Sequence, residues 1–152
     1  MSVNTKIKFT EETKMAIKLR ILHYPDNKKL SALCNEINSE YENSKFDKIP
    51  PAYPCERERL LVAFVKTGKE PTNELKMFCG DLTKARVENV AFIFDAPEST
   101  AKELADSAVK AGAKLAAEPK FIKFPGLFGG FSAEAKADIK AYIAEVYKAV
   151  QS

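Results

Sequence analysis

Few side chains in this sequence have the chemistry of a catalytic group. His23 is the only histidine, and it follows the apolar pair Ile21-Leu22, where a buried strand would end. The carboxyl end of a strand is where active sites of parallel sheets lie, although a polar residue that closes a strand is the simpler interpretation. We find no Ser-His-Asp arrangement, no paired acids with an evident role and no Walker phosphate loop. The sequence therefore does not favour a hydrolase or a nucleotide-hydrolysing enzyme.

The cysteines offer neither a metal site nor a redox pair. Cys34, Cys55 and Cys79 are far apart and form no CxxC motif, and one histidine cannot complete a Cys/His zinc site. We expect three reduced thiols, mostly buried. Cys34 and Cys79 lie on apolar helix positions and are typical of small hydrophobic residues. Cys55 stands beside Glu56 and Arg57, so we expect it to be the most exposed of the three, with no neighbour that would make it a nucleophile.

Composition indicates one globular domain. The 152 residues are 45% hydrophobic and 30% charged, with a net charge of +3. The lysines are spread along the chain, which does not favour a nucleic-acid partner. No apolar run approaches the roughly 18 residues of a membrane span, and no secretory signal begins the chain, so we expect a cytoplasmic protein. Residues 1–15 read as a polar arm, and residues 16–152 as the domain.

Hydrophobic patterning predicts five strands, of which two are uniformly apolar. Those two, residues 60–65 and 87–94, are typical of strands that are buried on both faces of a parallel sheet. A third predicted strand contains three prolines close together, which limit it to a short strand at the edge of the sheet. Pro119 is expected to interrupt the last. The remaining predicted strands are residues 16–22, 46–54 (the edge strand, which runs into an extended segment) and 114–124.

Helical spacing predicts four helices between these strands. The first starts near Lys28 and buries Leu30, Leu33, Ile37 and Tyr41, with Asp26 or Asn27 as its N-cap. Thr72 or Asn73 would cap the second, over Leu75, Phe78 and Leu82. Thr100 and Glu103 form a capping box for the third, which Gly112 ends. Ser132 would cap the last helix, which runs to Val150. Alternating strands and helices predict right-handed parallel crossovers.

From Ala16 to Val150 the chain resembles a short flavodoxin. Residues 21–24 followed by Lys28-Lys29-Leu30 are similar to a flavodoxin's first strand and helix, and residues 92–94 before a capped helix also match. A Gly/Pro loop and a capped final helix complete the likeness. The resemblance implies a three-layer, doubly wound parallel α/β sheet with strand order 2-1-3-4-5. It also implies FMN at the carboxyl edge of that sheet.

The resemblance places the FMN phosphate on the first β-α loop, but this loop departs from the family's pattern. The residues concerned are Tyr24, Asp26, Asn27, Lys28 and Lys29. Family members have hydroxyl side chains and glycine here, whereas this loop has no Ser, Thr or Gly. The proline after Tyr24 removes one donor, and Asp26 puts a carboxylate where the phosphate would sit. Lys28 and Lys29 offset that charge in part, and the helix N-terminus also favours an anion.

Two further loops complete the FMN site that the resemblance implies. Backbone N–H groups of Lys66, Thr67 and Gly68 are able to bond the flavin's pyrimidine edge, and Asp95 and Ala96 follow the fourth strand. Flavodoxins commonly flank the flavin with aromatic side chains from these loops. Here neither loop carries one. The sequence pI of 8.7 also differs from the acidic surfaces of typical flavodoxins.

Two hypotheses about function remain open. The first is an FMN-binding protein with an electron-transfer or flavin-reductase role and a redox partner protein. The second is a flavin-free module of the same fold, acting in protein or small-ligand binding. The aromatic run Phe121, Phe124, Phe128 and Phe131 would be a partner-facing patch under the second hypothesis, or simply core packing. The sequence does not choose between these hypotheses, and it leaves the oligomeric state open.

Overall fold

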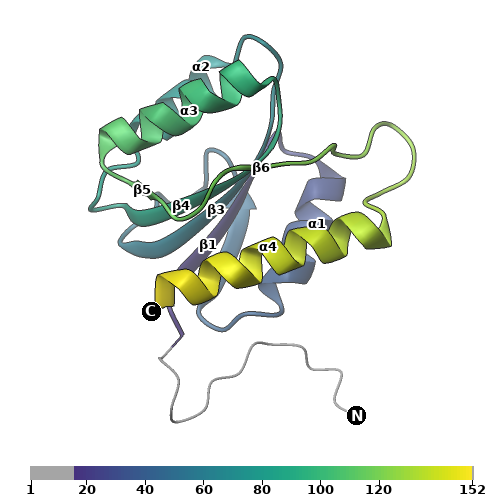
Figure 1. The fold of residues 1–152 in the computed structure, drawn as a ribbon, viewed down its shortest axis with the longest axis horizontal. Coiled ribbons are helices and arrows are strands. Elements are labelled where there is room, and N and C mark those ends of the chain that lie inside the picture. Colours follow the sequence, from purple (N-terminus) through teal and green to yellow (C-terminus); the bar gives the residue numbers. More distant parts are fainter. Residues whose placement is uncertain (1–15, 152) are drawn as a thin grey trace.

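The structure is a computed structural model that describes residues 16–151. Helices cover both faces of one sheet, so the fold has three layers: α2 and α3 lie on one face, α1 and α4 on the other (Figure 1). The expected arm, residues 1–15, lies outside the described residues, as does Ser152. The elements are β1 (Leu19–Tyr24), α1 (Lys28–Asn38), β2 (Ser44–Lys48), β3 (Glu58–Lys66), α2 (Asn73–Gly80), β4 (Val87–Asp95), α3 (Glu98–Ala111), β5 (Lys114–Leu115), β6 (Lys120–Phe121) and α4 (Ala133–Gln151).

All the strand pairs of the sheet are parallel, and their order confirms the prediction. The order is β2-β1-β3-β4-β5, and β6 pairs with β4 farther along the same edge. The predicted fifth strand is therefore two short pieces, with Pro119 between them. Because proline has no N–H to donate to the ladder, the break at this position is expected.

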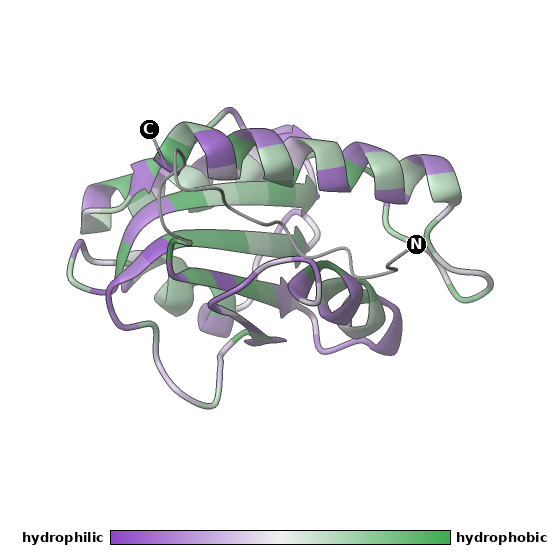
Figure 2. Ribbon diagram, turned by 90° about the horizontal axis from the view of Figure 1, so that it is seen from below, coloured by the Kyte–Doolittle hydropathy of each residue, from purple (hydrophilic) through white to green (hydrophobic). Residues whose placement is uncertain are grey.

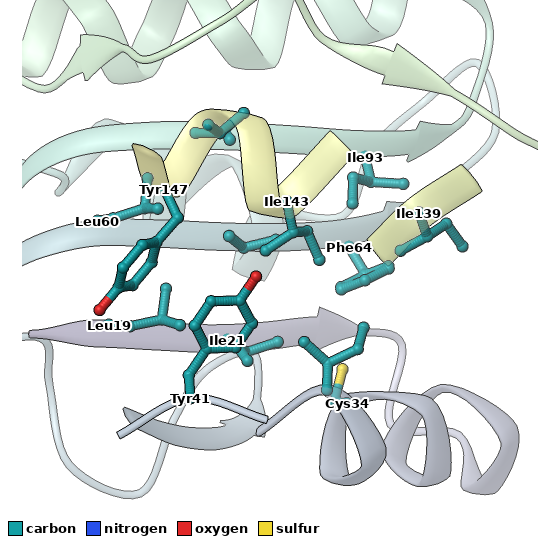
Figure 3. Close-up of a cluster of buried hydrophobic side chains, with 14 of the residues drawn as sticks. Leu19, Ile21, Cys34, Tyr41, Leu60, Phe64, Ile93, Ile139, Ile143 and Tyr147 are labelled. Carbon is teal, nitrogen blue, oxygen red and sulfur yellow. The ribbon is translucent and has the colours of Figure 1, made fainter. Parts of the chain in front are cut away.

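The two central strands, β3 and β4, are mostly apolar because helices cover both of their faces. Alternate residues point into two separate cores. One core lies under α1 and α4 and contains Ile21, Phe64 and Ile143 (Figure 3). The other lies under α2 and α3 and contains Phe92. Figure 2 shows the strands as mostly hydrophobic ribbons between helices with polar outer faces. The two strands are buried on both faces, as predicted: Leu61, Ala63, Phe64, Ala91 and Ile93 all have 0% exposure.

Side chains at the helix ends account for where most helices begin. Asn27 caps α1 and Thr72 caps α2, each one of the two predicted alternatives. The hydroxyl of Ser132 accepts the N–H of Ala135 at the start of α4, as predicted. Gly112 ends α3 with φ of 131°, and a Cβ there would lie 2.9 Å from the backbone nitrogen of Lys84. Only glycine fits that position.

The predicted capping box at Thr100 and Glu103 is wrong. Helix α3 begins earlier, at Glu98, and Pro97 stands at the cap position without a side-chain bond. Thr100 is therefore inside the helix and buried, and its hydroxyl donates to the carbonyl of Lys69 at 3.1 Å. Proline is well tolerated at a helix start because its missing N–H has no helical partner there. The capping-box pattern gave the wrong start because Thr100 bonds a neighbouring loop.

The crossover from β2 to β3 contains no helix, in contrast to the other crossovers. It consists of residues 49–57, which include Pro50, Pro51 and Pro54. Prolines at this density cannot sustain a helix. Across residues 16–151, none of the helices has the length and apolar character that a membrane span requires.

Candidate functional site

The parallel sheet brings the three predicted loops to one edge. Tyr24 lies opposite Val65 in the register of β1 and β3, and Lys66 lies opposite Asp95 in that of β3 and β4. The N–H of Thr67 donates to the carbonyl of Asp95 at 3.1 Å, which ties the second loop to the third. The chain reverses its winding between β1 and β3, and in such sheets ligands bind outside the carboxyl ends at this switch point.

At the start of α1, backbone donors are already in use. The side-chain Oδ1 of Asn27 accepts the N–H groups of Lys29, at 2.9 Å, and Leu30, at 3.1 Å. The carbonyl of Asn27 accepts the N–H of Ser31 at 2.8 Å, the first bond of the helix. An N-cap side chain satisfies the same orphan donors that would bind an anion. A phosphate at this helix would therefore compete with Asn27.

The charged side chains of the first loop differ in how they are held. The ammonium of Lys29 donates to the carbonyl of Gly126, across the edge in the loop before α4. Asp26 and Lys28 are exposed to solvent. Lys29 is thus a structural tie between two loops, and Lys28 is the lysine of this loop that extends freely into solvent.

Neighbouring polar groups at this edge also bond one another. The hydroxyls of Tyr24 and Thr72 lie 2.8 Å apart, which joins the first loop to the cap of α2. The Oδ2 of Asp95 accepts the N–H of Phe124 at 2.9 Å. His23 is 2% exposed, and its Nδ1 carries a proton that it donates to the carbonyl of Pro25 at 3.1 Å. These bonds hold the loops in place without a ligand.

As folded, the first loop does not fit the phosphate of FMN. Two helix-start donors are occupied by Asn27, Lys29 is bonded to Gly126, and the carboxylate of Asp26 faces solvent at the same helix start. A dianion would need free N–H groups and cations in those places. The arrangement instead bonds these groups to one another within the chain.

Phe121 is an aromatic side chain near this edge that the loop analysis missed. It is 46% exposed, and its ring lies 5.8 Å from that of Phe94. With Asp95, Ala96 and Lys123 it lines a shallow hollow of about 280 Å³. The sequence does show an apolar strand piece after Pro119 that contains Phe121. Its position beside Asp95 and Ala96, however, follows only from the pairing of β6 with β4.

Some phenylalanines of the run from Phe121 to Phe131 pack in the core, and others form an exposed apolar surface. Phe124 is buried, with its ring 6.4 Å from Phe64, and it packs against Phe131, which is partly buried. Phe128 is 88% exposed and Leu127 is 86% exposed, at the tip of a loop that extends away from the sheet (Figure 1). Part of the run is therefore core, and its tip is an apolar surface.

Cys55 is the most exposed of the three thiols, as expected, but even so it is buried. All three thiols are free and buried, and Cys55 is 4% exposed because the crossover folds it inward against α2. Burial raises the pKa of Cys55 and that of Cys79 to about 12, and it also raises the pKa of Cys34. Thiols with such pKa values remain protonated near neutral pH and are poor nucleophiles. Within residues 16–151, no group of three or more His, Cys, Asp or Glu residues could hold a metal.

A larger hollow lies away from the carboxyl edge, between the helix-free crossover and α2. Its volume is about 620 Å³, and prolines of the crossover, Cys55, Met77, Phe78 and Arg86 contribute to its lining. Sequence analysis did not predict it. The prolines were recognised as incompatible with a helix, but their position beside α2 depends on the fold.

Comparison with solved structures shows the fold of this chain. It is similar to a short-chain flavodoxin that is associated with a bacterial microcompartment, with 17% identity and a TM-score of 0.57, covering 91% of this chain and 100% of the other. It is also similar to the flavodoxin-like domain of a Synechococcus protein, with 11% identity and a TM-score of 0.54, covering 88% and 95% of the two chains. The chain thus has a flavodoxin-like fold. No family model matches the sequence, and no curated protein does.

Proposed function

We propose that this chain is a flavodoxin-fold module that works without a flavin and binds a protein partner or a small ligand. The observation that carries the proposal is the side chain of Asn27, which accepts the N–H groups of Lys29 and Leu30 at the helix start. The bond from Lys29 to Gly126 adds to it. The exposed pair Leu127 and Phe128 supports a binding role, because two adjacent exposed apolar side chains offer area that a partner could bury.

FMN binding, with an electron-transfer or flavin-reductase role and a redox partner protein, is the second candidate. The flavodoxin-like fold favours it, and so does Lys28, an exposed cation in the first turn of α1. FMN would supply the redox chemistry, and the chain would supply position and electrostatics. This candidate requires the Asn27 side chain to leave its two donors, at a cost of about 1 kcal/mol for a typical N-cap.

The two candidates are separated by titrating the purified, flavin-free chain with FMN and, in parallel, with riboflavin. Riboflavin lacks the phosphate, so the difference between the two affinities reports on the phosphate loop alone. Flavin fluorescence is the signal. We expect no preference for FMN up to about 100 µM, because the N–H groups of Lys29 and Leu30 and the ammonium of Lys29 already have acceptors within the chain. Micromolar binding of FMN with weaker binding of riboflavin would establish the second candidate.

A variant tests whether the loop can be repaired. Asp26→Ser replaces a carboxylate that repels phosphate with a hydroxyl that donates to it, and it should produce a measurable preference for FMN only if a phosphate can sit at this helix start. Asp106→Ser, which removes an exposed carboxylate from α3, is the matched control. If neither variant binds FMN better than riboflavin, the flavin-free proposal stands.

A further inference from the structure

The hollow beside α2 has walls that are fixed before any ligand arrives. The crossover wall contains prolines, whose φ angles are locked. Side chains of neighbouring strands pin that wall: the Oδ2 of Asp47 accepts the N–H of Ala52 at 2.8 Å, and Arg20 donates to the carbonyl of Tyr53. Glu58 accepts the N–H of Glu56 at 2.6 Å. A rigid hollow loses little conformational entropy on binding.

The lining of this hollow is chiefly apolar, and its size suits a small organic molecule. Pro50, Pro54 and Phe78 contribute rings, and Met77 is 73% exposed at its side. The volume of about 620 Å³ lies within the range of about 300–1,000 Å³ that is usual for small-molecule sites. An apolar body of the size of a fused aromatic ring system would find contacts on both walls.

Arg86 supplies a charged anchor in this apolar lining. Its Nε lies 3.4 Å from the Oδ2 of Asp81, and no other described residue forms an ion pair with the guanidinium. The side chain is 38% exposed, and its ion pair with Asp81 engages Nε and not the terminal nitrogens. Two parallel N–H groups match the two oxygens of a carboxylate. Asp81 and Glu74 also border the hollow, and they oppose any anion there, about twice as strongly for a ligand with two negative charges as for a ligand with one.

We propose that this groove, formed by residues 50–55, α2 and Arg86, binds a small apolar monocarboxylate. The ring or hydrocarbon body packs between the prolines and Phe78, and the carboxylate bonds the terminal nitrogens of Arg86. Asp81 keeps its place on Nε and orients the guanidinium. This inference deepens the proposed binding role by naming a ligand class, and its test is separate from the flavin titrations, so the two can fail independently.

The test compares naphthalene-2-carboxylate with naphthalene-2-carboxamide, which has the same shape but no charge. Isothermal titration calorimetry on the full chain gives both affinities, and the ¹³C-methyl signal of Met77 shows whether the probe lies in the groove. We expect the carboxylate to bind about tenfold or more tightly than the amide, as a charge-assisted bidentate pair should provide. Both probes should shift the Met77 signal.

Variants assign the preference to Arg86. Arg86→Gln should abolish the preference for the carboxylate and leave amide binding unchanged. Asp81→Asn should increase the preference, because it removes a negative charge beside the guanidinium. Arg57→Gln removes an exposed arginine at the end of the crossover and is the matched control that keeps the preference. Circular dichroism confirms that each variant is folded.

Three outcomes would overturn the proposal. They are equal affinity of the wild-type chain for the two probes, a carboxylate preference that survives Arg86→Gln, and the absence of any Met77 shift at millimolar probe.

Discussion

The Oδ1 atom of Asn27 lies 2.9 Å from the backbone nitrogen of Lys29 and accepts its hydrogen bond at the start of α1. In a flavodoxin-like fold this is the helix end that faces the switch point of the sheet. The bond therefore does two things: it stabilises the helix, and it occupies a donor that a phosphate would need. The first effect is measurable without any ligand.

Asn27→Ala should lower the free energy of unfolding by about 1 kcal/mol, the usual cost of losing an N-cap. Both the Lys29 and the Leu30 N–H groups lose their protein acceptor in this variant. Urea unfolding followed by circular dichroism measures the change. Asn35→Ala, at an exposed position in the same helix, is the control and should not be destabilised. Equal effects of the two substitutions would contradict the capping role.

Ile93→Ala tests the central strand. Ile93 has 0% exposure in β4 and belongs to the core under α1 and α4. Removing three carbons from such a site leaves a cavity, and the expected loss is about 2–5 kcal/mol. Val109→Ala, on the outer side of α3 with 47% exposure, should change stability much less. A loss below about 1 kcal/mol for Ile93→Ala in chemical denaturation would contradict its packing in the core.

The fold was largely predictable from this sequence, whereas the arrangement of the candidate site was not. The apolar runs of β3 and β4 and the spacing of Leu30, Leu33 and Ile37 follow from burial, which is repeated over many residues. Whether the N–H of Lys29 already has a hydrogen-bond acceptor depends on one rotamer of the Asn27 side chain. The position of Phe121 beside Asp95 depends on the pairing of a two-residue strand. Features that rest on one contact leave no periodic signal.

Errors at the sequence level came from residues whose partners are distant in the chain. Thr100 and Glu103 match a capping box, but the Thr100 hydroxyl bonds Lys69, which is remote in sequence. Cys55 is the most exposed thiol, as its charged sequence neighbours indicated, but the depth of its burial against α2 was not predictable from them. Local patterns cannot report such contacts, because tertiary packing overrides local preference.

Glu36 on α1 makes stability depend on acid pH. Lys140 and Lys136 of α4 donate to its two carboxylate oxygens, at 2.5 and 3.1 Å. The bond from Lys140, reinforced by Lys136, holds the pKa of Glu36 below its ordinary value, and the same bond, with Glu40, raises the pKa of Lys140. Folded Glu36 thus releases its proton more readily than unfolded Glu36, so its contribution is present above the unfolded pKa and disappears as pH falls through the folded pKa.

Glu36→Gln should therefore reduce stability at pH 7, and the difference from the wild-type chain should shrink as pH falls into the acid range and the wild-type carboxyl takes up its proton. The Glu36 side chain is 39% exposed, so solvent screening limits the difference to about 1 kcal/mol or less. Urea unfolding across this pH range measures it. The exposed Glu103→Gln on α3 is the control and should show no such pH-dependent difference. A constant offset at all pH values would contradict the ion-pair explanation.

Arg20 and Glu58 form a buried ion pair under the crossover, and Arg20→Met should cost about 3–5 kcal/mol. Their side chains are 9% and 3% exposed, and Nη1 of Arg20 lies 3.7 Å from Oε1 of Glu58. Removing the arginine leaves the buried carboxylate of Glu58 with Lys18, at 3.2 Å, as its one remaining ion-pair partner among residues 16–151, and it also frees the carbonyl of Tyr53. Urea unfolding measures the loss. Lys102→Met, which breaks an exposed pair with Asp106, should cost less than about 1 kcal/mol.

The double variant Arg20→Met with Glu58→Leu distinguishes a charge effect from a loss of packing. If the uncompensated carboxylate causes most of the loss, removing it as well should restore part of the stability, because apolar residues often replace buried ion pairs at little cost. The crossover should still loosen, since the bonds to Tyr53 and Glu56 are gone in the double variant. Faster amide exchange in residues 50–57, with most of the global stability recovered, is the expected result. A double variant as unstable as Arg20→Met alone would show that the pair acts through packing and not through charge.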